Sequence, residues 1–235
     1  MRIEVLADAD AVAQMASATI VEECRHAVRA RGRFVAAISG GRTPWRMLRV
    51  LAEQDVPWEH VHVIQVDERV APAGHADRNL THLRESLESA PLDARQIHAM
   101  PVEAPDLETA AARYAAALEA IAGSPSVLDL VHLGLGADGH TASLVPGDRA
   151  LDVDDADVAL TRVYQGRRRM TLTYPILDRA RRVLWVVTGS DKTGPLAQLL
   201  KGDASIPAGR VRQDQALILA DQAAARGLEI PAMRR

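Results

Sequence analysis

The sequence has few aromatic residues and only one cysteine. Aromatic side chains make up 3% of the 235 residues, so the core must be built mainly from alanine and aliphatic side chains. A single cysteine, Cys24, cannot form an internal disulfide, which favours a reducing compartment. Cys24 lies in a helical pattern rich in Ala and Val, where we expect a buried and unreactive thiol.

Long apolar runs and a large excess of either charge are also missing. No stretch is long enough to span a bilayer, and the N-terminus lacks the basic and then apolar segments of a signal peptide. We therefore expect a cytoplasmic protein that does not contact membranes. The net charge of −3 gives no indication of a nucleic-acid-binding surface. Three consecutive arginines at 167–169 concentrate positive charge locally, so an anion could bind there.

Short apolar runs alternate with helical patterns along the chain. Strands are predicted at residues 34–39, 61–67, 128–136, 182–189 and 216–221, with weaker candidates at 3–8 and 96–100. Helices are predicted at residues 9–31, 44–54, 79–89, 106–122 and 192–201. This alternation predicts an α/β fold with a mostly parallel, Rossmann-like open sheet and helices on both faces. No flexible linker or internal repeat divides the sequence, so we expect residues 1–235 to form a single domain.

The sequence offers no convincing metal site. The acidic stretch "DVDDADV" at 152–158 lacks the glycine and the final glutamate of a calcium-binding loop, and an exposed loop is predicted there. His60 and His62 alternate along a predicted strand, but two histidines without further ligands make a poor site. We predict neither a metal nor a cofactor. Seven histidines are predicted to be structural or exposed: His26, His60, His62, His75, His82, His98 and His132.

A glycine turn, "SGGRTP" at 39–44, follows a predicted strand. The paired glycines allow a ligand to approach the main chain. Thr43 is the expected N-cap of the next helix, with Pro44 at the first helical position, and an open helix N-terminus attracts anions. Five residues could then contact a phosphate: Ser39, Gly40, Gly41, Arg42 and Thr43. On this stretch alone, an unliganded turn is an equally good interpretation.

A second loop, "GLGADGHTASLVPG" at 134–147, carries the clearest chemical signal. It follows the most apolar predicted strand, so it should reach the same edge of the sheet as the glycine turn. Its early glycines would bring Asp138 and His140 close to a ligand. A histidine in such a position is suited to proton transfer near neutral pH.

Five stretches together resemble the superfamily of 6-phosphogluconolactonases and glucosamine-6-phosphate deaminases. They are "SGGRTP" at 39–44, "VDERVAP" at 66–72, "GLGADGHTASLVPG" at 134–147, "RMTLTYP" at 169–175 and "VTGSDK" at 187–192. Their order and spacing match the superfamily over most of the chain. The resemblance implies a sugar-phosphate enzyme that needs no metal.

The histidine loop separates the two branches of this superfamily. Lactonases carry sequences similar to "DGHTASLFPG", which this chain matches except for Val145 in place of Phe. Deaminases carry a glutamate shortly after the histidine, whereas residues 141–147 contain no acid. A second departure is Arg78 in "DRNL", where the family usually has Ser. The resemblance thus implies hydrolysis of 6-phospho-D-glucono-1,5-lactone to 6-phosphogluconate, a step of the oxidative pentose phosphate pathway.

The resemblance also implies roles for individual residues. His140 would act as general base, taking a proton from the water that attacks C1 and returning it to the departing ring oxygen. Asp138 would orient the imidazole or bind a sugar hydroxyl, although a simple loop turn is an equally good interpretation.

Four cations and one further carboxylate complete the predicted substrate site: Arg42, Asp67, Arg69, Arg169 and Lys192. The resemblance favours ligand contact for Arg69 over an ion pair with Asp67 or Glu68. Arg169 and Lys192 match family positions, whereas Arg167 and Arg168 do not and are expected to be solvated.

Other functions fit the sequence less well. An amino-sugar-phosphate isomerase or deaminase remains the main enzymatic alternative. A non-catalytic sugar-phosphate sensor would need a DNA-binding segment, and the first predicted strand begins near Ile3 and leaves no room for one. Ser143 does not lie in the G-x-S-x-G motif of a serine hydrolase, and no dinucleotide-binding fingerprint is present. The sequence makes no prediction of the oligomeric state.

Overall fold

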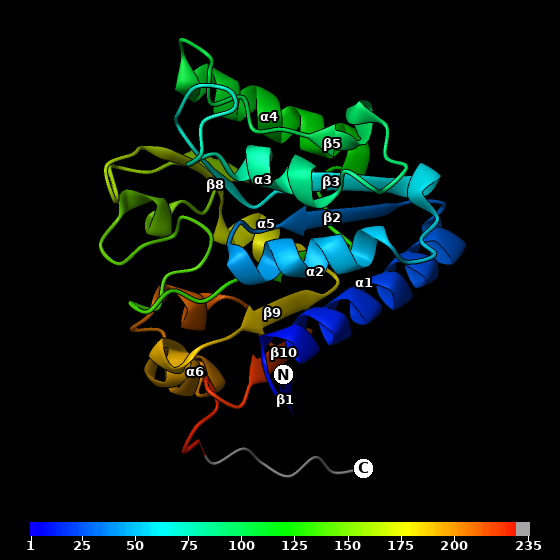
Figure 1. Cartoon of the computed structure of the whole chain (residues 1–235). Helices are drawn as coiled ribbons and strands as arrows, with labels where there is room; N and C mark the ends of the chain where they lie inside the picture. Colours follow the sequence, from blue (N-terminus) through cyan, green and yellow to red (C-terminus); the bar gives the residue numbers. More distant parts are fainter. Residues whose placement is uncertain (229–235) are drawn as a thin grey trace.

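A seven-stranded parallel sheet forms the centre of the molecule (Figure 1). The computed structural model describes residues 1–228. In spatial order the strands are β1 (Arg2–Leu6), β10 (Ala216–Asp221), β9 (Val183–Val187), β6 (Leu130–Leu133), β2 (Phe34–Ile38), β3 (Val61–Gln65) and β5 (Ile97–His98). Every neighbouring pair in this sheet is parallel. The predicted Rossmann-like open sheet is therefore confirmed, and each of the seven predicted runs contributes one of its strands.

Helices cover both faces of this sheet, as predicted. One core cluster joins the sheet to α1 (Ala9–Arg31), α2 (Arg42–Ala52) and α3 (Asn79–Ser86). The other joins it to α4 (Leu107–Ala122), α5 (Tyr174–Arg179) and α6 (Thr193–Leu200). Because successive strand residues face opposite sides, Ala36 of β2 belongs to the first cluster and Ala37 to the second. Short 3-10 turns occur at Trp58–His60, Ala94–Gln96, Arg149–Asp152, Ser190–Lys192 and Pro207–Arg210.

The first helix shows how local sequence sets the boundaries of these elements. Asp8 caps α1 by accepting hydrogen bonds from the backbone N–H groups of Asp10 and Ala11. Gly32 ends the helix in the left-handed conformation that glycine adopts most easily, with φ at 73°. Cys24 is fully buried on the inner face of the helix, and burial raises the pKa of its thiol to about 12. The expected unreactive thiol is thus what the structure shows.

A second, antiparallel sheet was not predicted. It consists of β4 (Asp67–Arg69), β8 (Arg169–Leu172) and β7 (Val158–Leu160), in the order β4-β8-β7. The predicted strand at 61–67 is therefore wrong as one element, because its last residue, Asp67, begins a strand of the second sheet. The pairing brings two predicted site residues, Arg69 and Arg169, directly opposite each other.

The acidic stretch at 152–158 is only partly the exposed loop that was predicted. Asp154 and Asp155 are exposed, but Asp157 forms an ion pair with Arg179 at 2.5 Å, and Val158 begins a buried strand. Within residues 1–228 no group of three or more His, Cys, Asp or Glu side chains could hold a metal ion. No helix in that same range is long and apolar enough to cross a membrane.

The strand order has a switch point between β2 and β6, where a crevice is expected at the carboxyl edge of the sheet. After β2 the chain continues to β3 and β5 on one side, whereas after β6 it continues to β9 and β10 on the other. The loops that leave β2 and β6 therefore diverge, and ligands bind at such points in open α/β sheets. Figure 1 shows this edge at the left, where the arrows of β2 and β9 end. The hydroxyl of Ser39 bonds the carbonyl oxygen of His132 at 2.8 Å and joins the two strands there.

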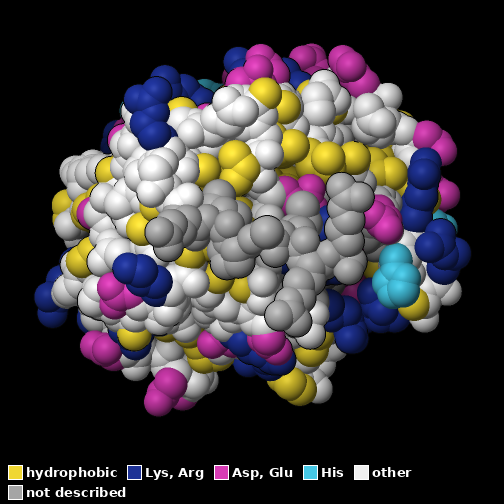
Figure 2. Space-filling model, turned by 90° about the horizontal axis from the view of Figure 1, so that it is seen from below, with side chains coloured by type: hydrophobic (Ala, Val, Ile, Leu, Met, Phe, Trp, Pro, Cys, Tyr) yellow, Lys and Arg dark blue, Asp and Glu magenta, His cyan; other side chains and the backbone are white. Residues whose placement is uncertain are grey.

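β1 is an edge strand and forms one of the two lateral margins of the seven-stranded sheet. Figure 2 views this side of the molecule, on which acidic, basic and apolar side chains are interspersed. Met1, Val5 and Met15, three large apolar residues that remain exposed, come from this first part of the chain. Neither the glycine turn nor the histidine loop lies at this margin, because both follow central strands.

We expect His132 to make the fold sensitive to acid. Its imidazole is fully buried, Nδ1 accepts a hydrogen bond from the Ser39 backbone N–H at 3.3 Å, and burial lowers its pKa to about 3. In the unfolded chain the imidazole takes up a proton near its ordinary pKa of 6.5. The contribution of His132 to the free energy of unfolding is therefore complete above about pH 6.5 and falls as the pH drops toward 3. The loss from this one group can reach about 1.4 kcal/mol per pH unit.

Urea unfolding of the wild type and of His132→Gln at pH 7 and pH 5 tests this expectation. The variant should lose less stability between the two pH values, whatever its stability at pH 7. Burial also lowers the pKa of His62 and His98, but both remain in the variant. His26→Gln, at an exposed position on α1, should keep the wild-type pH dependence. An unchanged pH dependence in His132→Gln would show that this expectation is wrong.

Candidate active site

The glycine turn leads directly into α2. Gly41, with φ at 131°, is the N-cap residue, and the Trp45 N–H is the first to bond back, to the Gly41 carbonyl at 3.1 Å. Helix geometry leaves the preceding N–H groups of Arg42 and Thr43 open at the crevice. The prediction of Thr43 as N-cap is wrong, because its hydroxyl instead bonds that of Thr188 at 2.7 Å. Pro44 is the third helical residue, not the first.

Asn79 connects the glycine turn to β4, and the sequence analysis did not identify it. A Cβ at Gly40 would lie only 2.0 Å from Asn79 Oδ1, so the space that a side chain would need is already filled. Asn79 Nδ2 donates to the main-chain oxygen of Asp67 at 2.9 Å and to its Oδ1 at 3.1 Å. Asn79 Oδ1 accepts from Arg69 Nη1 at 2.8 Å. The alternative of an Arg69 ion pair with Asp67 or Glu68 does not occur, since this guanidinium is held by Asn79 and the Asp77 carbonyl.

Glu68 anchors the segment that carries Asn79. Its carboxylate is fully buried and accepts hydrogen bonds from the backbone N–H groups of Arg69, Asn79 and Leu80. Arg78, which stands where the family usually has Ser, lies 3.1 Å from this carboxylate and is itself 3% exposed. It serves as a buried counter-ion that supports the site, and this explains the second departure from the family pattern.

The histidine loop holds Asp138 and His140 against Gly136. His140 Nδ1 lies 2.5 Å from Asp138 Oδ1, and the His140 backbone N–H donates to the same oxygen at 3.2 Å. A Cβ at Gly136 would be 2.1 Å from His140 Nδ1 and 2.7 Å from Asp138 Oδ1. The two side chains can therefore adopt this arrangement only when residue 136 is a glycine. The backbone contact is the loop turn of the alternative interpretation, and the same carboxylate oxygen also contacts the imidazole, so both arrangements occur together.

Electrostatics fixes the tautomer of His140. Burial alone raises the pKa of Asp138, but its hydrogen bonds with His140 and with the Tyr164 hydroxyl, at 3.0 Å, outweigh burial and hold that pKa below its ordinary value. A charged carboxylate can only accept, so we assign the proton of the neutral imidazole to Nδ1. Nε2 is then left with a lone pair that can take a proton from a substrate.

Arg169 and Asp67 meet at Ser143, beneath the surface of the site. Ser143 is fully buried, and its hydroxyl donates to Asp67 Oδ2 at 2.5 Å while lying 3.5 Å from Arg169 Nη1. This explains why Ser143 is no nucleophile, since its proton goes to a carboxylate and not to a histidine. Because both Asp67 oxygens have partners in Asn79 and Ser143, Asp67 supports the site from below. The predicted direct contact of Asp67 with a ligand gains no support from this arrangement.

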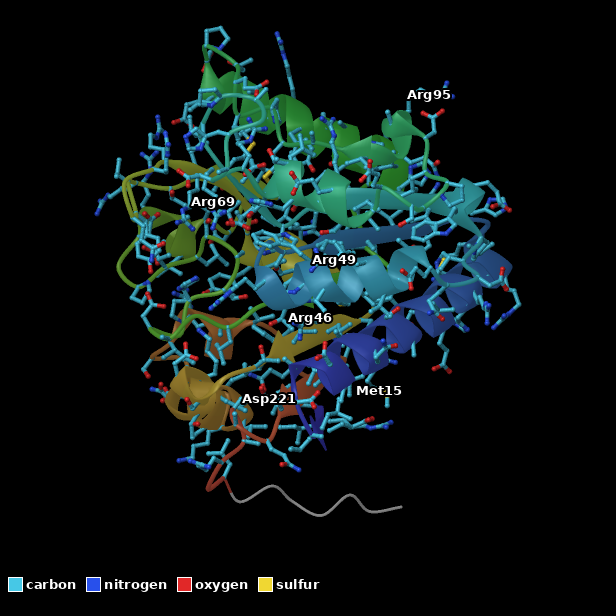
Figure 3. The ribbon with its side chains drawn as sticks, viewed as in Figure 1. Met15, Arg46, Arg49, Arg69, Arg95 and Asp221 are labelled. Atoms are coloured by element: carbon cyan, nitrogen blue, oxygen red, sulfur yellow. The ribbon has the colours of Figure 1, made fainter. Side chains whose placement is uncertain are left out.

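Lys192 belongs to the segment between β9 and α6, which contacts the glycine turn through the hydrogen bond between Thr188 and Thr43. It directly precedes α6 and its Nζ lies 2.8 Å from Asp191 Oδ2. The hydrogen bond from Lys192 and the charge of nearby Arg42 hold the pKa of Asp191 below its ordinary value, which places Arg42 in the same electrostatic neighbourhood. Asp221 anchors this loop by accepting from the Gly189 N–H at 3.1 Å. Figure 3 shows Asp221 and Arg69 at the same edge of the sheet.

Five of the eleven predicted site residues thus belong to one network of contacts, together with three residues that were not predicted. It runs through His140, Asp138, Tyr164, Arg169, Ser143, Asp67, Asn79 and Arg69. The other six lie outside this network: Ser39, Gly40, Gly41, Arg42 and Thr43 belong to the glycine turn, which meets Asn79 at Gly40, and Lys192 directly precedes α6. Arg167 and Arg168 are not simply solvated, because Arg167 pairs with Asp77 at 3.0 Å and Arg168 with Glu108 at 3.4 Å.

Comparison with known proteins assigns this arrangement to a family. The family profile described as glucosamine-6-phosphate isomerases/6-phosphogluconolactonase matches residues 7–219. The chain belongs to this family. A 6-phosphogluconolactonase from Nostoc sp. is 34% identical over 97% of this chain and 98% of its own length. The structure of a 6-phosphogluconolactonase from Thermotoga maritima superposes with a TM-score of 0.82, with 27% identity, 94% of this chain and 98% of that one covered.

Fold similarity does not separate the two activities in the family name. A monomeric glucosamine-6-phosphate deaminase superposes with a TM-score of 0.83 over 96% of this chain and 99% of its own, at only 16% identity. The distinction must therefore come from the residues of the site. The same fold occurs in proteins of both names.

We expect Gly136→Ala to displace the His140–Asp138 pair without unfolding the loop. The new Cβ would overlap the imidazole and the carboxylate, so the hydrogen bond between them should break. Proton NMR of the ligand-free protein should then lose the strongly downfield resonance of the His140 Nδ1–H. Gly134→Ala is the matched control, because a Cβ there meets no atom within 4 Å. A retained downfield signal in Gly136→Ala would refute the packing role of Gly136.

Proposed function

We propose that this protein hydrolyses 6-phospho-D-glucono-1,5-lactone to 6-phosphogluconate, with His140 as the general base. The observation that carries the proposal is the His140–Asp138 hydrogen bond of 2.5 Å, which leaves Nε2 as the basic atom of the neutral imidazole. The histidine side chain is 25% exposed at the crevice, so water and substrate can reach it. Relatives named 6-phosphogluconolactonase that align over nearly the whole chain support the same substrate.

The proposed reaction needs one base, one water and an electrophilic carbonyl. His140 Nε2 takes a proton as the water oxygen attacks C1, and the imidazolium formed is stabilised by the charged Asp138. The tetrahedral intermediate then collapses, its bond from C1 to the ring oxygen breaks, and the ring oxygen takes the proton from His140. The neutral imidazole is regenerated, and the product is the open-chain acid.

Cations at the rim would hold the phosphate at the far end of the sugar. Arg69 and Arg169 lie opposite each other on neighbouring strands, and both have limited freedom because their partners fix them. Arg169 Nε is buried and has no hydrogen-bond partner within the described part of the chain. Lys192, Arg42 and the open N–H groups at the start of α2 complete the positive rim.

The site residues favour the lactonase over the deaminase branch. Ring opening of an amino sugar in this family uses a glutamate shortly after the histidine, and the resemblance places that position within residues 141–147. Here this segment makes structural contacts: Thr141 Oγ1 donates to the Gly134 carbonyl at 2.9 Å, and Ser143 donates to Asp67. We therefore propose that glucosamine 6-phosphate is not a substrate.

His140→Gln tests the proposed chemistry. The variant should lose about 10²- to 10⁴-fold in kcat, the typical worth of general acid–base catalysis, and should still bind 6-phosphogluconate. The assay follows lactone disappearance with the spontaneous hydrolysis subtracted. His26→Gln is the matched control and should keep wild-type kcat, because His26 is exposed on α1, away from the carboxyl edge.

Two results would contradict the proposal. Turnover by His140→Gln within about threefold of the wild type would remove His140 from the mechanism. Release of ammonia from glucosamine 6-phosphate, with no enzymatic opening of the lactone, would assign the chain to the other branch of the family.

A further inference from the structure

Tyr164 contacts both Asp138, the partner of His140, and Arg169, a candidate phosphate ligand. It lies on the hairpin between β7 and β8, whose tip is Gln165 and Gly166 with φ of 49° and 80°. Tyr164 and Arg167 bridge across this tip, so the turn is tight and fixes the direction of the tyrosine. The hairpin is tied to the rest of the site by the ion pair of Arg167 with Asp77.

The hydroxyl of Tyr164 contacts the acid–base pair directly. It donates to Asp138 Oδ2 at 3.0 Å, while the other oxygen of the same carboxylate bonds His140. The tyrosine ring also stands edge-on to the imidazole, with the ring centroids 5.7 Å apart. Burial and the nearby Asp138 charge raise the pKa of Tyr164, so the phenol keeps its proton and acts as a donor.

The face of the same ring supports a phosphate-binding candidate. The guanidinium carbon of Arg169 lies 5.0 Å from the ring centroid, a cation–π distance. Gln165 completes the contact, accepting from Arg169 Nη2 at 3.2 Å and donating to the Tyr164 hydroxyl at 3.3 Å. One side chain thus touches both the carboxylate that orients His140 and the cation at the other end of the site.

We propose that Tyr164 is a positioning residue that shares the Asp138 carboxylate with His140 and so sets the basicity of the general base, while its ring positions Arg169 for the substrate phosphate. This inference rests on the proposed function for its kinetic consequences. A carboxylate that accepts a second hydrogen bond holds an imidazolium less strongly. The tyrosine hydroxyl therefore weakens the interaction of Asp138 with the imidazolium form of His140.

The charged groups around this pair are few, so their effects can be separated. His140 faces Asp138 on its own loop and Tyr164 on the hairpin. Arg169 stands behind the tyrosine ring, with the charges of Asp67 and Arg69 near it, and Arg167 of the hairpin pairs with Asp77. Tyr164→Phe removes one hydroxyl and leaves all of these charges in place.

Tyr164→Phe should shift the titration of His140 upward. NMR titration of the imidazole in the ligand-free protein should show a midpoint higher by about half a pH unit to one unit, because Asp138 has lost a donor. In lactone hydrolysis, the acidic limb of the kcat/KM profile should move by the same amount. We expect kcat at neutral pH to fall, by at most about threefold to tenfold, because less of the enzyme carries a neutral imidazole, and we expect KM to change little because the ring remains.

Tyr164→Leu separates the ring from the hydroxyl. Without the aromatic face, Arg169 should be held less well, so KM for the lactone should rise about threefold to tenfold above that of Tyr164→Phe. Tyr174→Phe is the matched control, because Tyr174 also lies against an arginine, Arg210, but its hydroxyl donates to the Pro207 carbonyl and not to Asp138. Its His140 midpoint should equal that of the wild type.

The outcomes distinguish this inference from the proposed function. A His140 midpoint in Tyr164→Phe that stays at the wild-type value, or falls, overturns the role of the hydroxyl. Equal KM values for Tyr164→Leu and Tyr164→Phe overturn the role of the ring. If the wild type hydrolyses no lactone, the proposed function fails, but the NMR titration still decides whether Tyr164 sets the basicity of His140.

Discussion

The site depends on one hydrogen bond, between the Asp138 carboxylate and Nδ1 of His140, made directly above Gly136. It fixes the orientation of the ring, assigns the proton of the neutral imidazole to Nδ1 and leaves a lone pair on Nε2, the atom that we propose as the base. The glycine is a condition for this bond, because even one methyl group at residue 136 would overlap both partners. The tyrosine on the neighbouring hairpin then shares the same carboxylate.

The fold places this pair by topology and a second sheet. The divergence of the chain after β2 and β6 opens the crevice, and Ser39 and His132 join the two strands beneath it. The antiparallel strands β4 and β8 bring two arginines into register beside it. The buried carboxylates of Glu68 and Asp67 then accept hydrogen bonds that hold these elements together. The residues at the surface of the site therefore pack on buried polar groups that have hydrogen-bond partners.

Much of this could be predicted, because long apolar runs and glycine-rich loops carry strong local signals. The seven parallel strands and the positions of His140 and Asp138 follow from such signals. The second sheet does not, since the three residues of β4 are all charged and follow β3 after a single residue, and β7 has only three residues. Asn79 and Tyr164 were missed because their roles arise from contacts with distant segments. "DRNL" before a helix was the only local hint of Asn79.

The structure of the protein with bound 6-phosphogluconate tests the central claim most directly. The account predicts that the C1 carboxylate of the product lies within hydrogen-bond distance of His140 Nε2, with the His140–Asp138 bond intact. The phosphate should lie among Arg42, Arg69, Arg169 and Lys192, at the rim of the crevice. A product bound with C1 away from His140, or with its phosphate against the imidazole, would contradict the account.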